Sequence, residues 1–350
     1  MPKASQPWLY SARADSAFIL APAFAVTALV EAFPGFFTAS NEVSAWNWLL
    51  LVVGIDVAHV YATLYRTYMD PEASRKYRGL LIGVPMGCWI AGVLLYSSGR
   101  LTFWRVLAYL AVFHFVRQQY GFLRLYARKE SQGPWGRRLD AAAIYLATLY
   151  PLVYWHTHPR AFHWFLPGDF FVFPAPWLER LTLAAYGIVL LLYAAKELRS
   201  KALNLPKHLV LAGTALSWYT GIVKHDGDLT FTVTNVVAHG VPYMALIWFF
   251  QRKQTPHGGT EDATRYRERW FRPSMIPLYL GLLLLLAYIE EGLWDVILWR
   301  DHTQFFAWLD FIPQVADRSL LALLVPLLAV PQATHYVLDG FIWRVREIET

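Results

Sequence analysis

This chain of 350 residues contains about ten apolar stretches, and each is close to the length of a membrane-spanning helix. A helix needs about 20 mostly apolar residues to cross a bilayer. Only 16% of the residues are charged, whereas soluble domains carry about 25%. We therefore predict an all-α, polytopic transmembrane bundle that forms one integral membrane domain, with spans at 16–35, 46–66, 79–97, 103–124, 139–156, 177–196, 207–223, 230–250, 274–290 and 319–342.

The basic residues are unevenly distributed between the loops. Of the 31 Lys and Arg residues, 23 lie in the segments on one predicted side and seven on the other, and Arg117 lies within a span. Cytoplasmic loops carry the excess of Lys and Arg, so both termini are expected in the cytoplasm, as in a bacterial inner-membrane protein. Because these residues sit in short loops, the net charge of +6 does not indicate nucleic acid as a partner. The apolar run after Lys3 and Arg13 resembles a signal peptide, but we expect an uncleaved first span.

Two segments on the predicted outer side, near 156–177 and 291–311, are rich in Trp and Phe and are expected to lie along the membrane interface. The first contains His156, His158 and His163, for which an aromatic belt is favoured over a metal site. His208 begins a span near the inner face, and a structural role is favoured over ligation. The single cysteine, Cys88, excludes an intrachain disulfide and a cysteine-based zinc or iron–sulfur site held by this chain alone.

Four predicted spans carry a histidine well inside the apolar run. Ionisable side chains there are costly in a bilayer and indicate function by default. In the second span Val52, Asp56, His59, Thr63 and Arg66 follow one helical stripe, and the other three spans contribute His114, His239, and His335 with Asp339. All four spans are even-numbered and should run in the same direction. Measured from their cytoplasmic ends, the four histidines fall within a layer of about 8 Å. We therefore predict that they converge on one centre.

Imidazole and carboxylate groups are ligands for iron, zinc, copper and manganese. The predicted metal ligands are Asp56, His59, His114, His239, His335 and Asp339, which could hold one or two ions. Asp339 could alternatively orient a ligand from outside the coordination sphere. The predicted catalytic or substrate-contacting residues are Arg117, Gln118, Tyr120, Asn235 and Tyr336, with Gln119 and Tyr61 close by in sequence.

A metal site reached through lipid suits chemistry on a membrane lipid or isoprenoid. Iron with open coordination positions activates dioxygen, so we predict an oxygenase, hydroxylase or desaturase that uses iron, dioxygen and, where the reaction requires it, an electron donor. In its spaced intramembrane histidines and its size, the chain resembles membrane enzymes that hold iron between helices, such as the Brp/Blh-type carotene dioxygenases. It departs from them around His59, where Val57-Ala58-His59 replaces a Pro-His-Gly motif, and it lacks the HxxxH and HxxHH boxes of membrane desaturases.

Three other functions remain open from the sequence. A zinc-dependent intramembrane lipid hydrolase would need three histidines, an aspartate and an activated water. A b-type haem protein would use two axial histidines but would leave both aspartates without a role. A transporter or proton relay would line a path with intramembrane acids and histidines, yet the chain shows no duplicated halves of the kind common in transporters.

Overall fold

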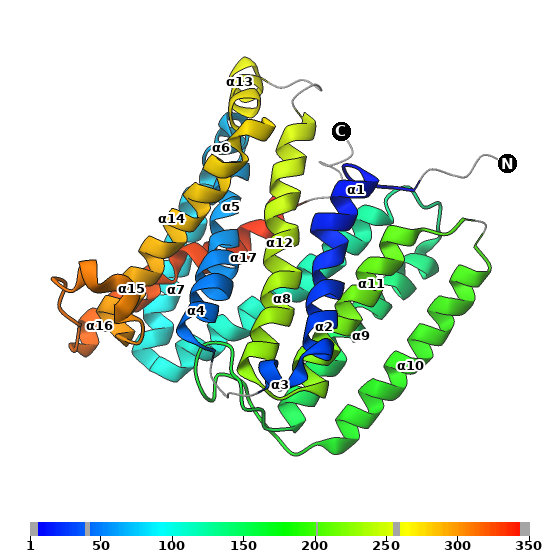
Figure 1. Cartoon of the computed structure of the whole chain (residues 1–350), viewed down its shortest axis with the longest axis horizontal. Helices are drawn as coiled ribbons and strands as arrows, with labels where there is room; N and C mark the ends of the chain where they lie inside the picture. The colour runs from blue at the N-terminus through cyan, green and yellow to red at the C-terminus, as the bar shows by residue number, and fades with distance from the viewer. Residues whose placement is uncertain (1–5, 39–42, 201, 255–259, 344–350) are drawn as a thin grey trace. The chain divides into compact units, whose positions relative to one another are not determined.

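The structure is a computed structural model that describes residues 6–38, 43–200, 202–254 and 260–343. Within this part of the chain all regular secondary structure is helical (Figure 1), which confirms the all-α prediction. Six helices are long and apolar enough to cross a membrane, and a bent pair would make a seventh. These helices are compatible with an integral membrane protein. The count of about ten spans stays a prediction, since the helices over the predicted spans 103–124, 139–156 and 207–223 are not among the six.

The chain divides into two compact units. Unit 1 is built from the described residues of 1–43 and 111–242, and unit 2 from those of 44–110 and 243–344. Two long helices, α8 (Arg100–Tyr126) and α12 (Asp228–Gln254), each contribute one part to unit 1 and the other part to unit 2.

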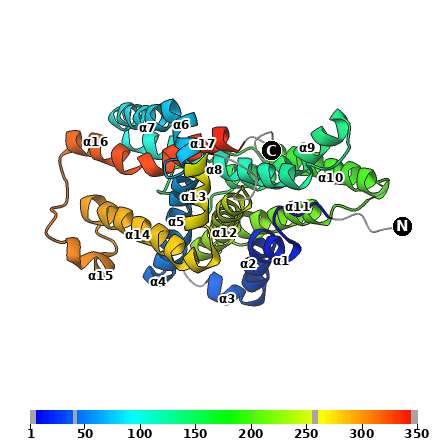
Figure 2. The ribbon, with the colours of Figure 1, turned by 90° about the horizontal axis from the view of Figure 1, so that it is seen from above.

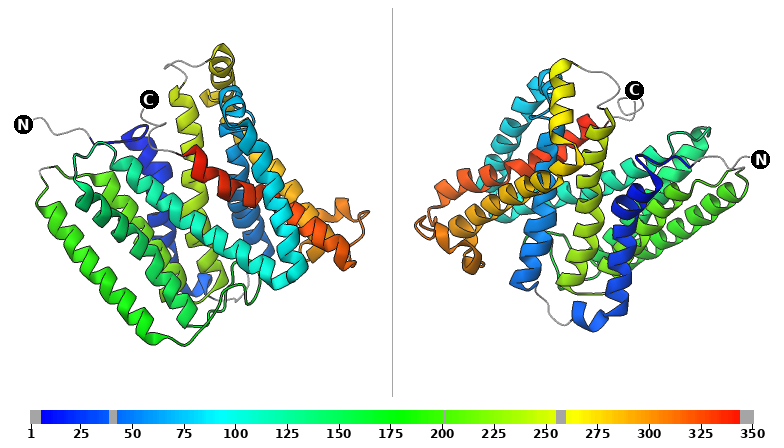
Figure 3. Two further views of the ribbon diagram at one scale, coloured as in Figure 1. Left: turned by 180° about the vertical axis from the view of Figure 1, so that it is seen from behind. Right: turned by 45° about the horizontal axis from the view of Figure 1, so that its top comes forward.

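Unit 1 is a bundle of helices in which a long segment, residues 158–175, connects α9 to α10. Helix α9 lies along α10 and also packs on α11, which in turn packs on α2 (Figures 1 and 3). The other helices of this unit are short. Besides parts of α8 and α12, unit 1 contains α1 (Ala12–Asp15), the π-helix η1 (Ser16–Leu20), α2 (Ala21–Ala32), α3 (Pro34–Phe37), α9 (Pro134–Thr157), α10 (Pro176–Leu198), α11 (Leu205–Trp218) and the π-helix η3 (Tyr219–Lys224).

In unit 2 the span at Ala45–Arg66 packs on α14, and α7 packs on α16 and α17 (Figure 2). Its core is strongly aromatic, with Tyr65, Tyr243 and Tyr279 all at most 3% exposed. The elements of unit 2, apart from its portions of α8 and α12, are α4 (Ala45–Trp48), the π-helix η2 (Leu49–Val57), α5 (Ala58–Arg66), α6 (Pro71–Lys76), α7 (Arg78–Ser98), α13 (Glu261–Trp270), η4 (Pro273–Met275), α14 (Ile276–Trp294), the π-helix η5 (Asp295–Trp299), α15 (Thr303–Phe306), η6 (Ala307–Leu309), α16 (Arg318–Leu328) and α17 (Val330–Ile342).

Two helices leave most of their apolar surface uncovered within the chain. In α7 and in α10 only 11% of the most apolar 18-residue window is buried. Exposed side chains such as Ile82, Ile90 and Leu94 on α7, and Ile188 and Leu191 on α10, form these surfaces. In water such faces would be costly, whereas lipid tails are as apolar as leucine and cover them without penalty.

The predicted span 319–342 is not one straight helix. It consists of α16 and α17, which meet at an angle of 41° around Ala329. Pro331, in the first turn of α17, has no N–H with which to continue the hydrogen bonds of α16, and a proline ring clashes with the carbonyl one turn before it. The bend therefore has a local cause in the sequence, and it sets the direction of the helix that carries His335.

Candidate metal centre

Four histidines form the one group of three or more potential ligands able to hold a metal ion among the side chains that the structure describes. They are His59 on α5, His114 on α8, His239 on α12 and His335 on α17, and all four are buried. A buried His cluster of this kind fits a metal-binding membrane protein. Each histidine came from the sequence as a predicted ligand, while the identity of any metal stays a prediction.

In unit 2, His59 and His335 face each other from α5 and α17, two helices that pack together. Their ring centroids are 5.0 Å apart and their planes are inclined by 78°. Tyr243 lies against both rings, with centroids at 5.7 Å from His59 and 5.0 Å from His335. Both imidazoles are 1% exposed, so neither exchanges its contacts with solvent.

In unit 1, His114 and His239 repeat this arrangement on α8 and α12. Their ring centroids are also 5.0 Å apart, with an interplanar angle of 81°. Phe115 stacks flat on His239 at 3.5 Å and 8°, and Gln118 Nε2 donates to the His239 carbonyl oxygen at 2.9 Å. The stacked ring and the amide hold the His239 ring and its backbone in a defined position.

The separation of 5.0 Å between the ring centroids of each pair can be compared with that of two imidazoles bound to one metal ion. Two imidazoles that bind one ion through nitrogens at about 2.0–2.1 Å have ring centroids about 4.5–5.3 Å apart on adjacent corners, and about 6.5 Å apart on opposite sides. Each pair therefore has the spacing of neighbouring ligands of one tetrahedral or octahedral ion. Neither pair by itself has the spacing of the two axial ligands of a haem.

Asp56 and Asp339 lie beside the unit 2 pair, one next to each histidine. Asp56 Oδ1 is 3.7 Å from His59 Nδ1, and Asp339 Oδ1 is 3.8 Å from His335 Nδ1. Both separations exceed a hydrogen bond. Asp339 Oδ1 instead accepts a hydrogen bond of 2.6 Å from the Tyr243 hydroxyl. Direct ligation of a metal by either aspartate stays a prediction. The contacts of Asp339 fit the alternative prediction that this residue orients a ligating histidine from outside the coordination sphere.

A chain of hydroxyl groups connects Asp339 to His335. The Tyr243 oxygen is 2.9 Å from Thr63 Oγ1, and Thr63 Oγ1 is 2.7 Å from His335 Nδ1. The sequence indicated Thr63 only as a member of the helix stripe that bears His59, and it gave no reason to single out Tyr243. The available signal was that Tyr243 follows His239 by one helical turn.

The buried acid Glu290 of unit 2 was not among the predicted site residues. Glu290 is 5% exposed and accepts hydrogen bonds from the Tyr61 hydroxyl at 2.6 Å and from Trp294 Nε1 at 3.4 Å. The predicted span ended at residue 290, whereas the helical segment continues from Pro273 to Trp299. Glu290 was therefore the last residue of the predicted span, where an acid is expected to reach the membrane surface, whereas the longer helix places it inside the protein.

The other predicted site residues make the following contacts. Arg117 is exposed, donates to the Tyr145 hydroxyl at 2.6 Å and lies over the ring of Tyr120, which itself stacks on Tyr145. Asn235 Nδ2 donates to the carbonyl of Phe231 one turn earlier on α12. Gln119 accepts from Thr214, and the Tyr336 ring lies 5.7 Å from that of His335. Catalytic roles for Arg117, Gln118, Tyr120, Asn235 and Tyr336 stay predictions.

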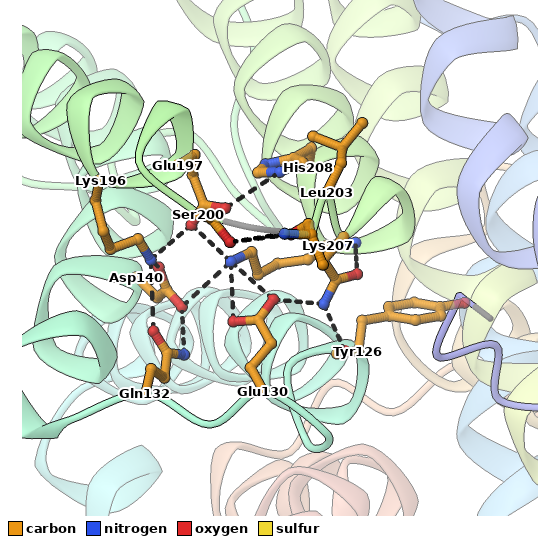
Figure 4. A network of polar contacts seen from close by, with 12 residues as sticks. Tyr126, Glu130, Gln132, Asp140, Lys196, Glu197, Ser200, Leu203, Lys207 and His208 are labelled. Carbon is orange, nitrogen blue, oxygen red and sulfur yellow. Dashed lines mark hydrogen bonds and ion pairs between the residues drawn. The ribbon is translucent and has the colours of Figure 1, made fainter. Parts of the chain in front are cut away.

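His208 belongs to a network of charged side chains in unit 1, drawn in Figure 4. At its centre the buried Lys207 ammonium pairs with Glu130 at 2.9 Å and Glu197 at 2.7 Å, and Lys196 pairs with Asp140 and Glu197. His208 Nδ1 is 2.8 Å from the Tyr193 hydroxyl and its Nε2 is 3.4 Å from Glu197. These contacts give His208 a structural setting among α9, α10 and α11.

The loop between α9 and α10 surrounds a cavity of about 330 Å³ that is lined by Trp155, Phe162, His163 and Phe170 among others. Asp169 accepts hydrogen bonds from the amides of Phe165 and Leu166, which closes the loop. Burial raises the pKa of Asp169, and these amide donors oppose that shift. His156 contacts the Leu152 carbonyl and His158 stacks on Tyr154.

Comparison with known proteins found no match for this chain among family models, curated proteins or solved structures.

Proposed function

We propose that this protein is a membrane-embedded metalloenzyme in which His59, His114, His239 and His335 together bind one transition-metal ion. The observation that carries the proposal is the presence of four buried histidines, one group of potential ligands, on four helices that the sequence alone had selected. Their arrangement in two pairs, each with the spacing of neighbouring ligands, supports a shared ion.

Iron is the proposed metal, and the proposed reaction is oxidation of a lipid or isoprenoid dissolved in the membrane. Histidine-held iron with open coordination positions supplies dioxygen activation. Hydroxylation and desaturation each consume one dioxygen, two electrons and two protons, so either reaction needs an electron donor, whereas oxidative cleavage places both oxygen atoms in the products and needs none. The uncovered apolar faces of α7 and α10 fit an enzyme that sits among its substrate molecules.

A zinc-dependent lipid hydrolase is the second candidate, since the same imidazoles suit zinc and Asp56 lies beside one of them, His59. Metal analysis and oxygen dependence separate the two candidates. The ring separation of 5.0 Å argues against either pair as the two axial ligands of a haem. Absence of a Soret band would exclude a haem bound by any other two of these histidines.

The test is metal quantification on protein purified in detergent. We expect about one equivalent of iron, and we expect His59→Ala and His114→Ala, one from each pair, to lower it to background. His158→Ala is the matched control, because this histidine lies at the end of α9 with a side chain 41% exposed. Undiminished metal in both pair variants would refute the ligand assignment, and zinc with oxygen-independent turnover would favour the hydrolase.

We further propose that both termini face the cytoplasm, as in a bacterial inner-membrane protein, on the basis of the Lys and Arg distribution. Tags at either end should be accessible to protease or to a membrane-impermeant label only from the cytoplasmic side. Labelling of one terminus from the opposite side would show that the number of spans is odd and would overturn this topology.

A further inference from the structure

Four polar side chains of unit 2 form a series of hydrogen bonds with a defined direction. They are Asp339, Tyr243, Thr63 and His335. Tyr243 donates to Asp339 Oδ1 at 2.6 Å. Thr63 Oγ1 lies 2.9 Å from the Tyr243 oxygen and 2.7 Å from His335 Nδ1. The series draws on α5, α12 and α17, and both Thr63 and His335 are buried.

The directions of these hydrogen bonds follow from counting protons. A tyrosine or threonine hydroxyl has a single proton to donate. Because Tyr243 gives its proton to Asp339, its oxygen must accept from Thr63 in their contact. Thr63 has then used its own proton, so its oxygen must accept in the contact with His335 Nδ1. Only a protonated Nδ1 can donate there, and a neutral imidazole protonated at Nδ1 carries its lone pair on Nε2.

We propose that Thr63 and Tyr243 are positioning residues that hold His335 as its Nδ1–H tautomer and present Nε2 as the metal-binding nitrogen. The use of Nε2 for a metal rests on the proposed function, while the tautomer itself does not. Outer hydrogen bonds of this kind fix the orientation of ligating histidines, and their loss typically lowers metal affinity 10- to 100-fold. The series ends at Asp339, whose Oδ1 is the final acceptor and thereby sets the direction of every donor in the series.

The same counting predicts different effects for two conservative substitutions. In Tyr243→Phe the Thr63 hydroxyl loses its acceptor and can rotate to donate to His335 Nδ1, which places the ring proton on Nε2 and blocks that nitrogen. In Thr63→Val the ring loses its partner without gaining a competing donor, and Thr63→Ser restores the series. Thr67→Val is the control, because the Thr67 hydroxyl donates to the backbone carbonyl of Thr63 and takes no part in the series.

The experiment is solid-state NMR of metal-free protein in lipid with ¹⁵N-labelled histidine, where the His335 signals are assigned by their loss in His335→Gln. We expect an Nδ1–H tautomer in the wild type, in Thr63→Ser and in Thr67→Val, and an Nε2–H tautomer in Tyr243→Phe. An Nε2–H ring in the wild type, or an unchanged tautomer in Tyr243→Phe, would overturn the inference even if both proteins are folded.

Titration with Co²⁺ alone, followed by its visible absorption, tests the connection to the metal. We expect Tyr243→Phe to weaken Co²⁺ binding about 10- to 100-fold and Thr63→Ser and Thr67→Val to leave it within about twofold. If the tautomer changes as expected while the wild type binds no Co²⁺, the positioning role of Thr63 and Tyr243 is supported and the proposed metal site is refuted.

Discussion

Replacing Lys207 by Met should lower the free energy of unfolding of unit 1 by much more than the loss of one surface charge would. The Lys207 side chain is 1% exposed and its ammonium is the shared partner of Glu130, Glu197 and, at 3.8 Å, Asp140. Removing one partner of a buried ion pair costs about 3–5 kcal/mol, because the remaining charge stays buried. Lys196 still pairs with Asp140 and Glu197 in the variant, so we expect the lower end, about 3 kcal/mol, or a change of roughly 100-fold in the unfolding equilibrium.

The matched control is Arg75→Met, which removes a cation from a pair of similar length. Arg75 and Asp262 are 2.7 Å apart, but their side chains are 65% and 60% exposed, and exposed pairs contribute about 0–1 kcal/mol. Both variants should be compared by denaturant titration in mixed micelles. A second variant, Lys207→Met with Glu130→Gln, should recover part of the loss since it removes one of the unpaired charges. Equal stability of Lys207→Met and Arg75→Met would refute the reasoning.

Two further predictions concern packing and pH. Gly221→Ala should destabilise the protein by about 1–3 kcal/mol, because a Cβ there would lie 2.0 Å from Thr234 Oγ1. Gly281→Ala is the control, since a Cβ there meets nothing within 4 Å. Equal unfolding midpoints of the two variants would contradict this prediction. Burial lowers the pKa of His302, partly opposed by nearby acids, and its ring stacks on Trp48 at 3.7 Å. The contribution of this ring should therefore fall as pH drops below about 6.5, and the loss of thermal stability between pH 7 and 5 should be smaller in His302→Phe.

The candidate site could be predicted from the sequence because ionisable groups are conspicuous in apolar segments. A histidine or an acid in a run of Leu, Val and Ile is rare enough to be informative by itself, and His59, His114, His239 and His335 stood out for that reason. Helical spacing then placed Asp56 and Asp339 on the same faces as their neighbouring histidines, where the structure has them. The helical fold followed from the same apolar segments.

Hydroxyl groups gave no such signal. Thr63 and Tyr243 are common residues in membrane helices, and their importance lies in a chain of contacts between residues 180 and 272 positions apart in the sequence. Glu290 was missed for a different reason, because helix ends are the least certain part of a hydropathy profile. The bend at Ala329 follows from Pro331, but its angle depends on packing against α7, which no local pattern contains.

The charge of the proposed ion explains why two aspartates stand beside a set of neutral ligands. Four imidazoles bind a divalent cation without reducing its charge, and an uncompensated charge is costly inside a membrane. Asp56 and Asp339, each within 4 Å of an imidazole of the unit 2 pair, would supply two negative charges without entering the coordination sphere. On this view the aspartates balance the ion, and the histidines determine which ion is bound.

This balance can be tested with substitutions that preserve shape. Asp56→Asn and Asp339→Asn should each weaken Co²⁺ binding about 10- to 100-fold, and the double variant should weaken it further, with less effect on unfolding than on affinity. Asp262→Asn is the control, because that carboxylate is exposed on α13. If both single variants bind Co²⁺ as tightly as the wild type, the aspartates do not balance the ion. If instead unfolding and affinity change in parallel, they serve as structural partners of their helices, and the counter-charge must come from the substrate or from the acid at Glu290.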